Sequence, residues 1–321
     1  MATGPSAREE GKGMKVIGFG DNIMDSFIDR GISYPGGNCL NFAVMTRKLG
    51  AEASYLGVFG SDPMGTYLQD VLTLQGVTFP HAQIRRGSSG AAHILVVNGE
   101  RVILESSHGG VTADQPFILS EQDIDYLNGF DLVHSSAYSS SEEELPKLRR
   151  LECLTSFDFS DDAEYRTREY LERVAPSVDL ALFSCSETGL EATKELLRRT
   201  VALGPAMAVA TRGPEPAIVF DGRDFHTCPA GPVVKQGLLV DTMGCGDAFI
   251  AAFTLRLLES GWTRSTLPAG SVLATALVDG RDNAASQCLV EASFACGLPM
   301  KDHRFQEGED GQREGAPSFP R

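Results

Sequence analysis

The chain has 321 residues, 42% of them hydrophobic, which is enough for one large domain with a sizeable core. Its formal net charge of −15 argues against nucleic acid or an anionic membrane surface as the main partner, because both attract lysine and arginine. The seven cysteines form no CxxC pair, which argues against a disulfide framework or a zinc site and favours the reducing cytoplasm.

The two ends of the chain differ from the rest in composition. Residues 1–13 and 301–321 are polar and rich in glycine and proline, so we expect both to be disordered around one folded domain at 14–300. The first of these segments lacks the apolar stretch of a secretory signal. The sequence contains no run of about 18 apolar residues, so no membrane span is predicted.

Strands and helices alternate along the folded part. The first strand is expected at 15–19 and the first helix at 38–49, where Gly50 ends the helical spacing of apolar residues. The alternation continues with strands at 53–60, 131–134, 154–159, 178–183 and 206–211, and with helices at 64–75, 142–151, 165–174 and 187–199. This order predicts an α/β fold with a mostly parallel central sheet and helices on both faces.

One segment breaks this alternation. Two apolar runs, 91–97 and 100–106, are separated by Asn98–Gly99, the pattern of a β-hairpin with a two-residue turn. We expect this hairpin to leave the main sheet and to form a small antiparallel β lid over a site, built from segments near 25–35 and 90–108. Because exposed strand edges seek partners, we expect a homodimer through this lid. A second hairpin is expected with its turn at Asp221–Gly222.

The stretch DTMGCGDAF at 241–249 places a loop almost without side chains directly before an apolar helical run. Gly244 and Gly246 let the backbone turn tightly, and the first-turn N–H groups of the helix form an anion site together with the helix dipole. We expect the carboxylate of Asp247, at the rim of this positive pocket, to stay ionised and to accept a proton from a nearby hydroxyl. This layout suits phosphoryl transfer; the alternative is a plain turn with an aspartate helix cap.

Other phosphate-binding loops are missing from the sequence. No GxxxxGK[ST] motif occurs, so the chain is not a P-loop protein. Gly18–Phe19–Gly20 follows the first strand as a dinucleotide loop would, but Ile23 replaces the third glycine and Asp21 would repel a pyrophosphate. A Rossmann dehydrogenase is therefore not expected.

With these motifs the sequence resembles the ribokinase-like, or PfkB, carbohydrate kinases. DTMGCGDAF matches the C-terminal signature of that family, with Cys245 in place of a common alanine, and residues 36–41 match its N-terminal glycine signature. Gly20 through Asp25 match its first-strand element, and the resemblance covers residues 14 to about 300 in the same order. It implies a ribokinase-like fold and a kinase that uses ATP and Mg²⁺ to phosphorylate a sugar.

The resemblance also implies a role for each matching residue. Asp247 would be the catalytic base, and the anion hole would come from Gly244, Cys245 and Gly246. The sugar hydroxyls would be held by Asp25, Gly36, Gly37, Asn38 and Asn41. The ATP side would be formed by Ser184, Glu187, Thr211 and Gly213, with Glu187 near Mg²⁺ through water. Asp241, followed by Thr242, would lie at a site for a monovalent cation such as K⁺.

Four stretches resemble the fructoselysine 6-kinases within this family: GDNIMD, PGGNCLNFAV, FDLVHSSAY and SFDFSD. Such enzymes phosphorylate the sugar of an Amadori adduct, in which a hydroxyl-rich ketose carries a cationic amino-acid end. Asp21 and Asp158 are candidates for holding the amine, and each has a structural alternative, as a turn cap or at a strand end. The implied function is transfer of the γ-phosphate of ATP to a primary hydroxyl of such an adduct. The alternatives are a plain ketose, ribose or nucleoside as acceptor, or an inactive sensor of the same fold.

Two features depart from the family pattern. Ser184 stands where the family carries an asparagine, so Glu187 is the better candidate of the two for the magnesium side. The polar stretch Asp279–Ala285 reads as an extra segment inside the second apolar helix, which leaves the adenine contacts open.

Overall fold

The computed structural model describes residues 13–300 except 98–99, 105–106 and 234–235. Its main sheet has nine strands in the order β13-β12-β11-β10-β9-β8-β1-β4-β5. All neighbours are parallel except β12 and β13, which add antiparallel strands at one edge. The strands are β1 (Lys15–Gly20), β4 (Glu52–Gly60), β5 (Gln83–Arg85), β8 (Leu132–Ser136), β9 (Leu154–Asp158), β10 (Leu180–Ser184), β11 (Met207–Arg212), β12 (Glu215–Phe220) and β13 (Phe225–Cys228).

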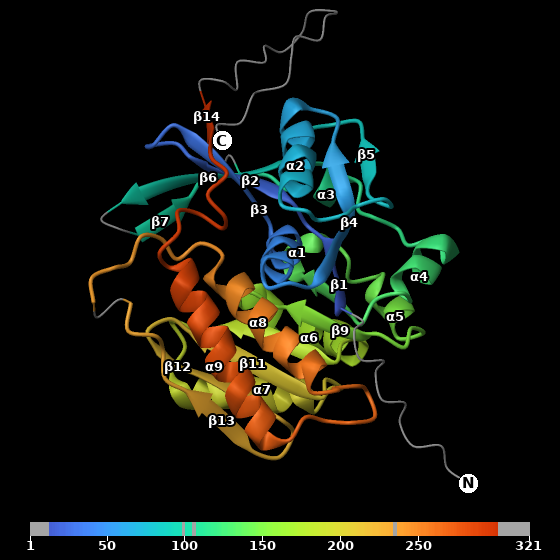
Figure 1. Cartoon of the computed structure of the whole chain (residues 1–321), viewed down its shortest axis with the longest axis vertical. Coiled ribbons are helices and arrows are strands. Elements are labelled where there is room, and N and C mark those ends of the chain that lie inside the picture. The colour runs from blue at the N-terminus through green and yellow to red at the C-terminus, as the bar shows by residue number, and fades with distance from the viewer. Residues whose placement is uncertain (1–12, 98–99, 105–106, 234–235, 301–321) are drawn as a thin grey trace, which may run out of the picture.

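Helices cover both faces of this sheet, as predicted, because its inner strands are apolar on both sides. In β10, Leu180 and Leu182 pack with one group of helices, and Ala181 and Phe183 pack with the other. The first group is α1 (Asn38–Lys48), α8 (Cys245–Glu259) and α9 (Gly270–Gln287), with α8 and α9 side by side in Figure 1. The second group is α4 (Glu121–Leu127), α5 (Leu145–Leu148), α6 (Arg168–Val174) and α7 (Leu190–Val201). Two further helices, α2 (Pro63–Leu74) and α3 (Gly110–Asp114), lie near β4.

A second, five-stranded sheet has the order β14-β3-β2-β6-β7 and lies at the end of the molecule away from β13 (Figure 1). The predicted hairpin is confirmed by the antiparallel pairing of β6 with β7, although its Asn98–Gly99 turn lies outside the described residues. The expectation of a purely antiparallel sheet is wrong, because β2 pairs with β6 in parallel. The strands are β2 (Ile23–Phe27), β3 (Ile32–Gly36), β6 (Gly90–Val97), β7 (Glu100–Ile103) and β14 (Leu298–Pro299).

Two other predicted segments take a more definite form in the structure. Asp279–Ala285 lies in the second half of α9 as continuous helix, where Asp279 bonds Arg256 of α8 at 2.5 Å and Asn283 donates to the Ala248 carbonyl at 2.7 Å. Its polar residues thus fasten α9 to α8. The second predicted hairpin is confirmed by the antiparallel pairing of β12 with β13, but its turn spans 221–224 and not only Asp221–Gly222. The Asp221 carboxylate accepts the N–H of Asp224 at 2.7 Å across this turn.

The predicted disordered ends, apart from Gly13, lie outside the described residues. In the part of the chain that the structure describes, no helix is both long and apolar enough to cross a membrane.

Candidate active site

The carboxyl ends of several parallel strands meet beside the first turns of α1 and α8, the usual place for a ligand site in such a sheet. Asp21 follows β1, Asp158 ends β9 and Ser184 ends β10. Asn38 and Asn41 come from the first turn of α1, and Asp247 comes from the first turn of α8. The fold therefore brings together polar residues that are more than 200 positions apart in the chain.

Asp21 holds the start of α1 in place. Its carboxylate accepts the N–H of Asn38 at 2.6 Å and that of Cys39 at 3.2 Å, so it caps a helix whose own N-cap, Gly37, has no side chain. The hydroxyls of Ser136 and Ser139 donate to the same carboxylate at 2.8 and 2.9 Å. Both oxygens of Asp21 thus serve the structural role that the sequence left as an alternative to amine binding.

The two glycines predicted for the substrate side, Gly36 and Gly37, lie tightly against Asp25 and Asp21. Gly37 has φ +102°, and a β-carbon there would lie 2.8 Å from Cα of Asn22. A β-carbon on Gly36 would lie 2.2 Å from Oδ2 of Asp25, so only glycine leaves room for that carboxylate. The glycine signature therefore lets the chain pass close to both Asp21 and Asp25.

Asp158 is buried and accepts hydrogen bonds from Nδ2 of Asn38 at 2.9 Å and from the N–H of Ser160 at 2.7 Å. Burial raises the pKa of Asp158 to about 7, and the charge of Asp21 acts in the same direction. The carboxyl is thus close to half-protonated at neutral pH and would gain strongly from a cation beside it.

This raised pKa makes the stability of the protein depend on pH. Between the ordinary carboxyl pKa of 3.8 and about 7, the folded state binds the Asp158 proton more tightly than the unfolded state does. The free energy of unfolding therefore falls as pH rises through this window, by at most about 4 kcal/mol from this group. We expect the Tm of Asp158→Asn to fall less between pH 5 and 8 than the Tm of the wild type, with a difference of several degrees by calorimetry. Glu187→Gln, at an exposed position, is the control, and a variant curve parallel to the wild type would contradict the assignment.

Asp247 is only 6% exposed, and its carboxylate accepts a hydrogen bond from Nδ2 of Asn41 at 2.8 Å. Burial raises the pKa of Asp247 well above its usual value, and the charges of Asp158, Asp21 and Asp25 raise it further, whereas the Asn41 bond lowers it. Burial and these charges therefore act against the expectation that the helix terminus keeps this carboxylate ionised. Removal from water and three neighbouring acids favour the protonated form, whereas the Asn41 bond and the helix terminus favour the carboxylate.

The glycine loop turns into α8 through Gly244, which has φ +72°. A β-carbon there would lie 2.9 Å from Oγ of Ser293 and 3.0 Å from Cε of Met45, so the position is closed to other residues. The Cys245 N–H donates to the Thr242 carbonyl over 3.3 Å. Met243 packs against the cluster of Phe27, Tyr34, Ile94 and Ala292, which joins the loop to the small sheet.

Buried polar atoms without hydrogen-bond partners cluster at this place. Among the described residues, Oγ of Ser293 beside Gly244 has no partner, and neither does Oδ1 of Asn41. Ser293 is fully buried and Asn41 is 4% exposed. Buried polar atoms are normally paired, so these two fit a site that takes a polar group between α1 and α8.

The residues predicted for the ATP side also come together. A β-carbon on Gly246 would lie 3.9 Å from Oγ of Ser184, which places the end of β10 beside the tip of α8. The Cys185 N–H donates to the Thr211 carbonyl at 2.7 Å, and Gly213, with φ +57°, faces Ser186. Glu187 is exposed on the same loop.

Asp241 is engaged by the backbone around it. Its carboxylate accepts the N–H groups of Thr242 at 2.7 Å, Met243 at 3.0 Å and Ala292 at 3.2 Å. It therefore ties the glycine loop to the segment after α9. Within the described residues there is no cluster of three or more histidine, cysteine or acidic side chains that could hold a metal ion.

Sequence reasoning missed several residues that shape the site. Ser136 lies in a stretch that carried the family resemblance and Ser139 follows that stretch, but nothing local connects their hydroxyls to Asp21. Arg166 donates to Oγ1 of Thr188 at 3.1 Å and also contacts the Ser184 carbonyl, which braces the β10 loop. Ser293 lies in a part of the chain without a motif. Only the long-range contacts identify these residues.

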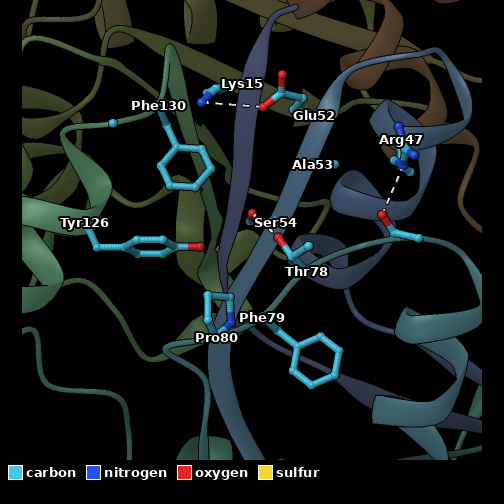
Figure 2. A pocket seen from close by; sticks show the side chains of 12 residues that line it. Lys15, Arg47, Glu52, Ala53, Ser54, Thr78, Phe79, Pro80, Tyr126 and Phe130 are labelled. Atoms are coloured by element: carbon cyan, nitrogen blue, oxygen red, sulfur yellow. Dashed lines mark hydrogen bonds and ion pairs between the residues drawn. The ribbon is translucent and has the colours of Figure 1, made fainter.

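A separate groove of about 820 Å³ lies at the opposite ends of the strands. It begins at Lys15 and Glu52, the first residues of β1 and β4, and Figure 2 shows Tyr126 and Phe130 along one side of it. Lys15 pairs with Glu52 there at 3.5 Å. None of the predicted site residues lines this groove, so its size is not evidence for the active site.

Comparisons with known proteins identify the family of the chain. Residues 29–287 match the family model described as pfkB family carbohydrate kinase. The chain is 34% identical over 302 residues to the fructosamine kinase FrlD of Bacillus subtilis (strain 168), covering 94% of this chain and 99% of that protein. It is 30% identical over 268 residues to the fructoselysine 6-kinase of Escherichia coli (strain K12), covering 83% and 95%.

Solved structures show the same fold. The ribokinase of Arabidopsis thaliana, complexed with ribose and ATP, superposes with a TM-score of 0.71 at 18% identity, over 88% of this chain and 94% of that one. The aminoimidazole riboside kinase of Salmonella enterica, complexed with its riboside and an ATP analogue, gives 0.66 at 20% identity, over 90% and 98%. The predicted ribokinase-like α/β fold is therefore confirmed.

Proposed function

Because the chain belongs to the pfkB family of carbohydrate kinases and is therefore a phosphotransferase with an alcohol acceptor, we propose that its acceptor is a sugar–amine adduct of the fructosamine class. The γ-phosphate of ATP is transferred to a primary hydroxyl of the sugar. Two relatives whose names give fructosamine or fructoselysine as the substrate support this choice.

The observation that carries the proposal is the charge of the site. Asp21, Asp25, Asp158 and Asp247 are all buried, and the pKa of Asp247 is raised by the other three. Among the described residues, Asp21, Asp158 and Asp247 form no ion pair with a lysine or arginine. Such a site favours an acceptor that brings its own positive charge, and the ammonium of a sugar–amine adduct supplies it. Asp158 would face this ammonium.

In the proposed reaction, Asp247 accepts the proton of the attacking hydroxyl, and Asn41 keeps its carboxylate oriented through the 2.8 Å hydrogen bond. The backbone amides of Gly244, Cys245 and Gly246 stabilise the charge on the transferring phosphoryl group. The sugar hydroxyls are held by Asp25, Gly36, Gly37, Asn38 and Asn41.

On the other side of the tip, ATP would lie along Ser184, Thr211 and Gly213. The bare tip of α8 and the unpartnered Ser293 hydroxyl fit a phosphate there. Mg²⁺, held through water by Glu187, would supply charge neutralisation on the phosphates. Asp241 is the candidate for a K⁺ site at the same loop.

The small sheet would act as a lid that excludes water, since Met243 of the glycine loop packs directly on it. The edge strand of this sheet, β7, leaves Val102 and Ile103 exposed, which supports a homodimer through this edge. The proposed location of the enzyme is the cytoplasm. A monomer mass measured by light scattering would contradict the dimer.

The test is an acceptor screen by ADP release with fructoselysine, fructose, ribose and adenosine. We expect the highest kcat/KM for fructoselysine. Asp158→Asn should lower kcat/KM for fructoselysine by about tenfold or more while changing that for fructose little, because only the first acceptor is cationic. Equal rates for fructose and fructoselysine would favour a plain ketose kinase. Tight acceptor binding without ADP release would favour the sensor.

A further inference from the structure

Two thiols meet at the glycine loop. Cys245 is the first residue of α8, Cys288 follows the last residue of α9, and their sulfur atoms lie 3.3 Å apart. Both side chains are half-buried. Four of the other cysteines are buried, and Cys296 contacts Gln75 instead of another sulfur. This contact therefore distinguishes Cys245 and Cys288 from the rest.

The pair has the properties of a reactive dithiol. The hydrogen bond from Cys245 lowers the pKa of Cys288 to about 7, so one thiol proton is readily lost near neutral pH and the two sulfurs share the other. Burial instead raises the pKa of Cys39, Cys153 and Cys296. The first-turn position of Cys245 adds the favourable field of a helix N-terminus for a thiolate.

Movement of either thiol would reach the phosphate-binding loop. The Cys288 carbonyl accepts the N–H of Val240 at 2.8 Å and that of Asp241 at 3.3 Å, and Asp241 in turn holds Thr242 and Met243. A disulfide needs its sulfurs about 2.05 Å apart, so the two sulfur atoms, now 3.3 Å apart, must approach by about 1 Å. Where the backbone takes up this movement, the amide of Cys245 at the tip of α8 shifts with it.

We propose that Cys245 and Cys288 form a reversible disulfide that switches off phosphoryl transfer. With hydrogen peroxide as oxidant, one thiolate attacks a peroxide oxygen, which gives a sulfenic acid and releases hydroxide. The second thiol attacks the sulfenic sulfur, the S–S bond forms and water leaves. In total, two thiols lose two electrons and two protons, and one peroxide becomes two waters. A dithiol reductant reverses the reaction by exchange.

The effect on catalysis rests on the proposed function, because it requires the tip of α8 to bind the phosphoryl group. A displacement of about 1 Å in a catalytic group lowers turnover by about 100-fold. Oxidation of the wild type is therefore expected to lower turnover by about that factor, and dithiothreitol is expected to restore it.

The experiment combines peptide mapping with activity. After peroxide treatment, digestion without reductant should yield one peptide joining Cys245 to Cys288, lighter by two hydrogens than its parts. Cys288→Ser, with Cys288→Ala as a second variant, should keep normal activity when reduced and should resist peroxide. Cys296→Ser, at another half-buried thiol, should remain as sensitive as the wild type.

Three outcomes would overturn the switch: no joined peptide, a joined peptide with unchanged turnover, or equal peroxide sensitivity in Cys288→Ser. The joined peptide is scored without any catalysis. A reduced wild type that phosphorylates no acceptor would therefore reject the proposed function, while a missing peptide would reject the thiol pair.

Discussion

Asp247→Asn is expected to lower kcat by about 10²–10⁴-fold while leaving ATP binding almost unchanged, because general-base catalysis contributes on that scale. The variant keeps an oxygen that can accept the hydrogen bond from Asn41, so the start of α8 should fold as before. It loses only the ability to take the proton. Turnover is measured by ADP release, and ATP binding by calorimetry.

The stability of this variant separates chemistry from folding. Since burial raises the pKa of Asp247, ionising it in the folded state destabilises the protein as pH rises. Asp247→Asn should therefore have a Tm equal to or above that of the wild type at neutral pH. Asp282→Asn, at an exposed position of α9, is the matched control and should keep normal turnover. Turnover of Asp247→Asn within a few-fold of the wild type would remove the base assignment.

Gly244→Ala is expected to have the second largest effect. The new β-carbon would lie 2.9 Å from Oγ of Ser293 on a backbone with φ +72°, so both the contact and the conformation are unfavourable. We expect a loss of about 1–3 kcal/mol in the free energy of unfolding. We also expect a fall of about 100-fold in kcat, because the amides at the tip of α8 must shift.

Gly261→Ala tests whether this loss of activity comes from the loop or only from lower stability. Gly261 follows the other end of α8, has φ +83°, and has no atom within 4 Å of a new β-carbon. It should lose stability through backbone strain alone and keep its turnover. Urea unfolding and ADP release are measured on both variants. Equal activity losses would show that the position of Gly244 at the helix tip does not matter.

The layered fold was predictable because its signals are local. Strands such as β10 and β11 are continuous apolar runs, and the helices between them have apolar residues at helical spacing. The parallel pairing of β2 with β6 was not predictable, because hydrophobic patterns do not fix which edges meet. Polar residues within Asp279–Ala285 interrupt the apolar pattern of α9 because two of them bond to α8, a partner that is not visible in the sequence of α9 itself.

Positions in the candidate site were predictable where the residues lie in one motif. They were not predictable where long-range packing brings the residues together. The stretch at 241–249 predicted a glycine turn that leads into a helix with Asp247 in its first turn, which the structure confirms. The raised pKa of that carboxylate was not predictable, because it depends on Asp158 and Asp21, which lie far away in sequence and come close only in the folded sheet. The bracing contacts of Ser139 and Arg166 were missed for the same reason.

The most direct test of the account is a crystal structure with ADP, Mg²⁺, aluminium fluoride as a planar mimic of the moving phosphoryl group, and fructoselysine. We predict that the fluorides lie about 3 Å from the backbone nitrogens of residues 244–246. We also predict that a primary hydroxyl of the sugar lies about 3 Å from the carboxylate of Asp247. A mimic bound away from the tip of α8, with Asp247 in contact only with protein atoms, would contradict the account.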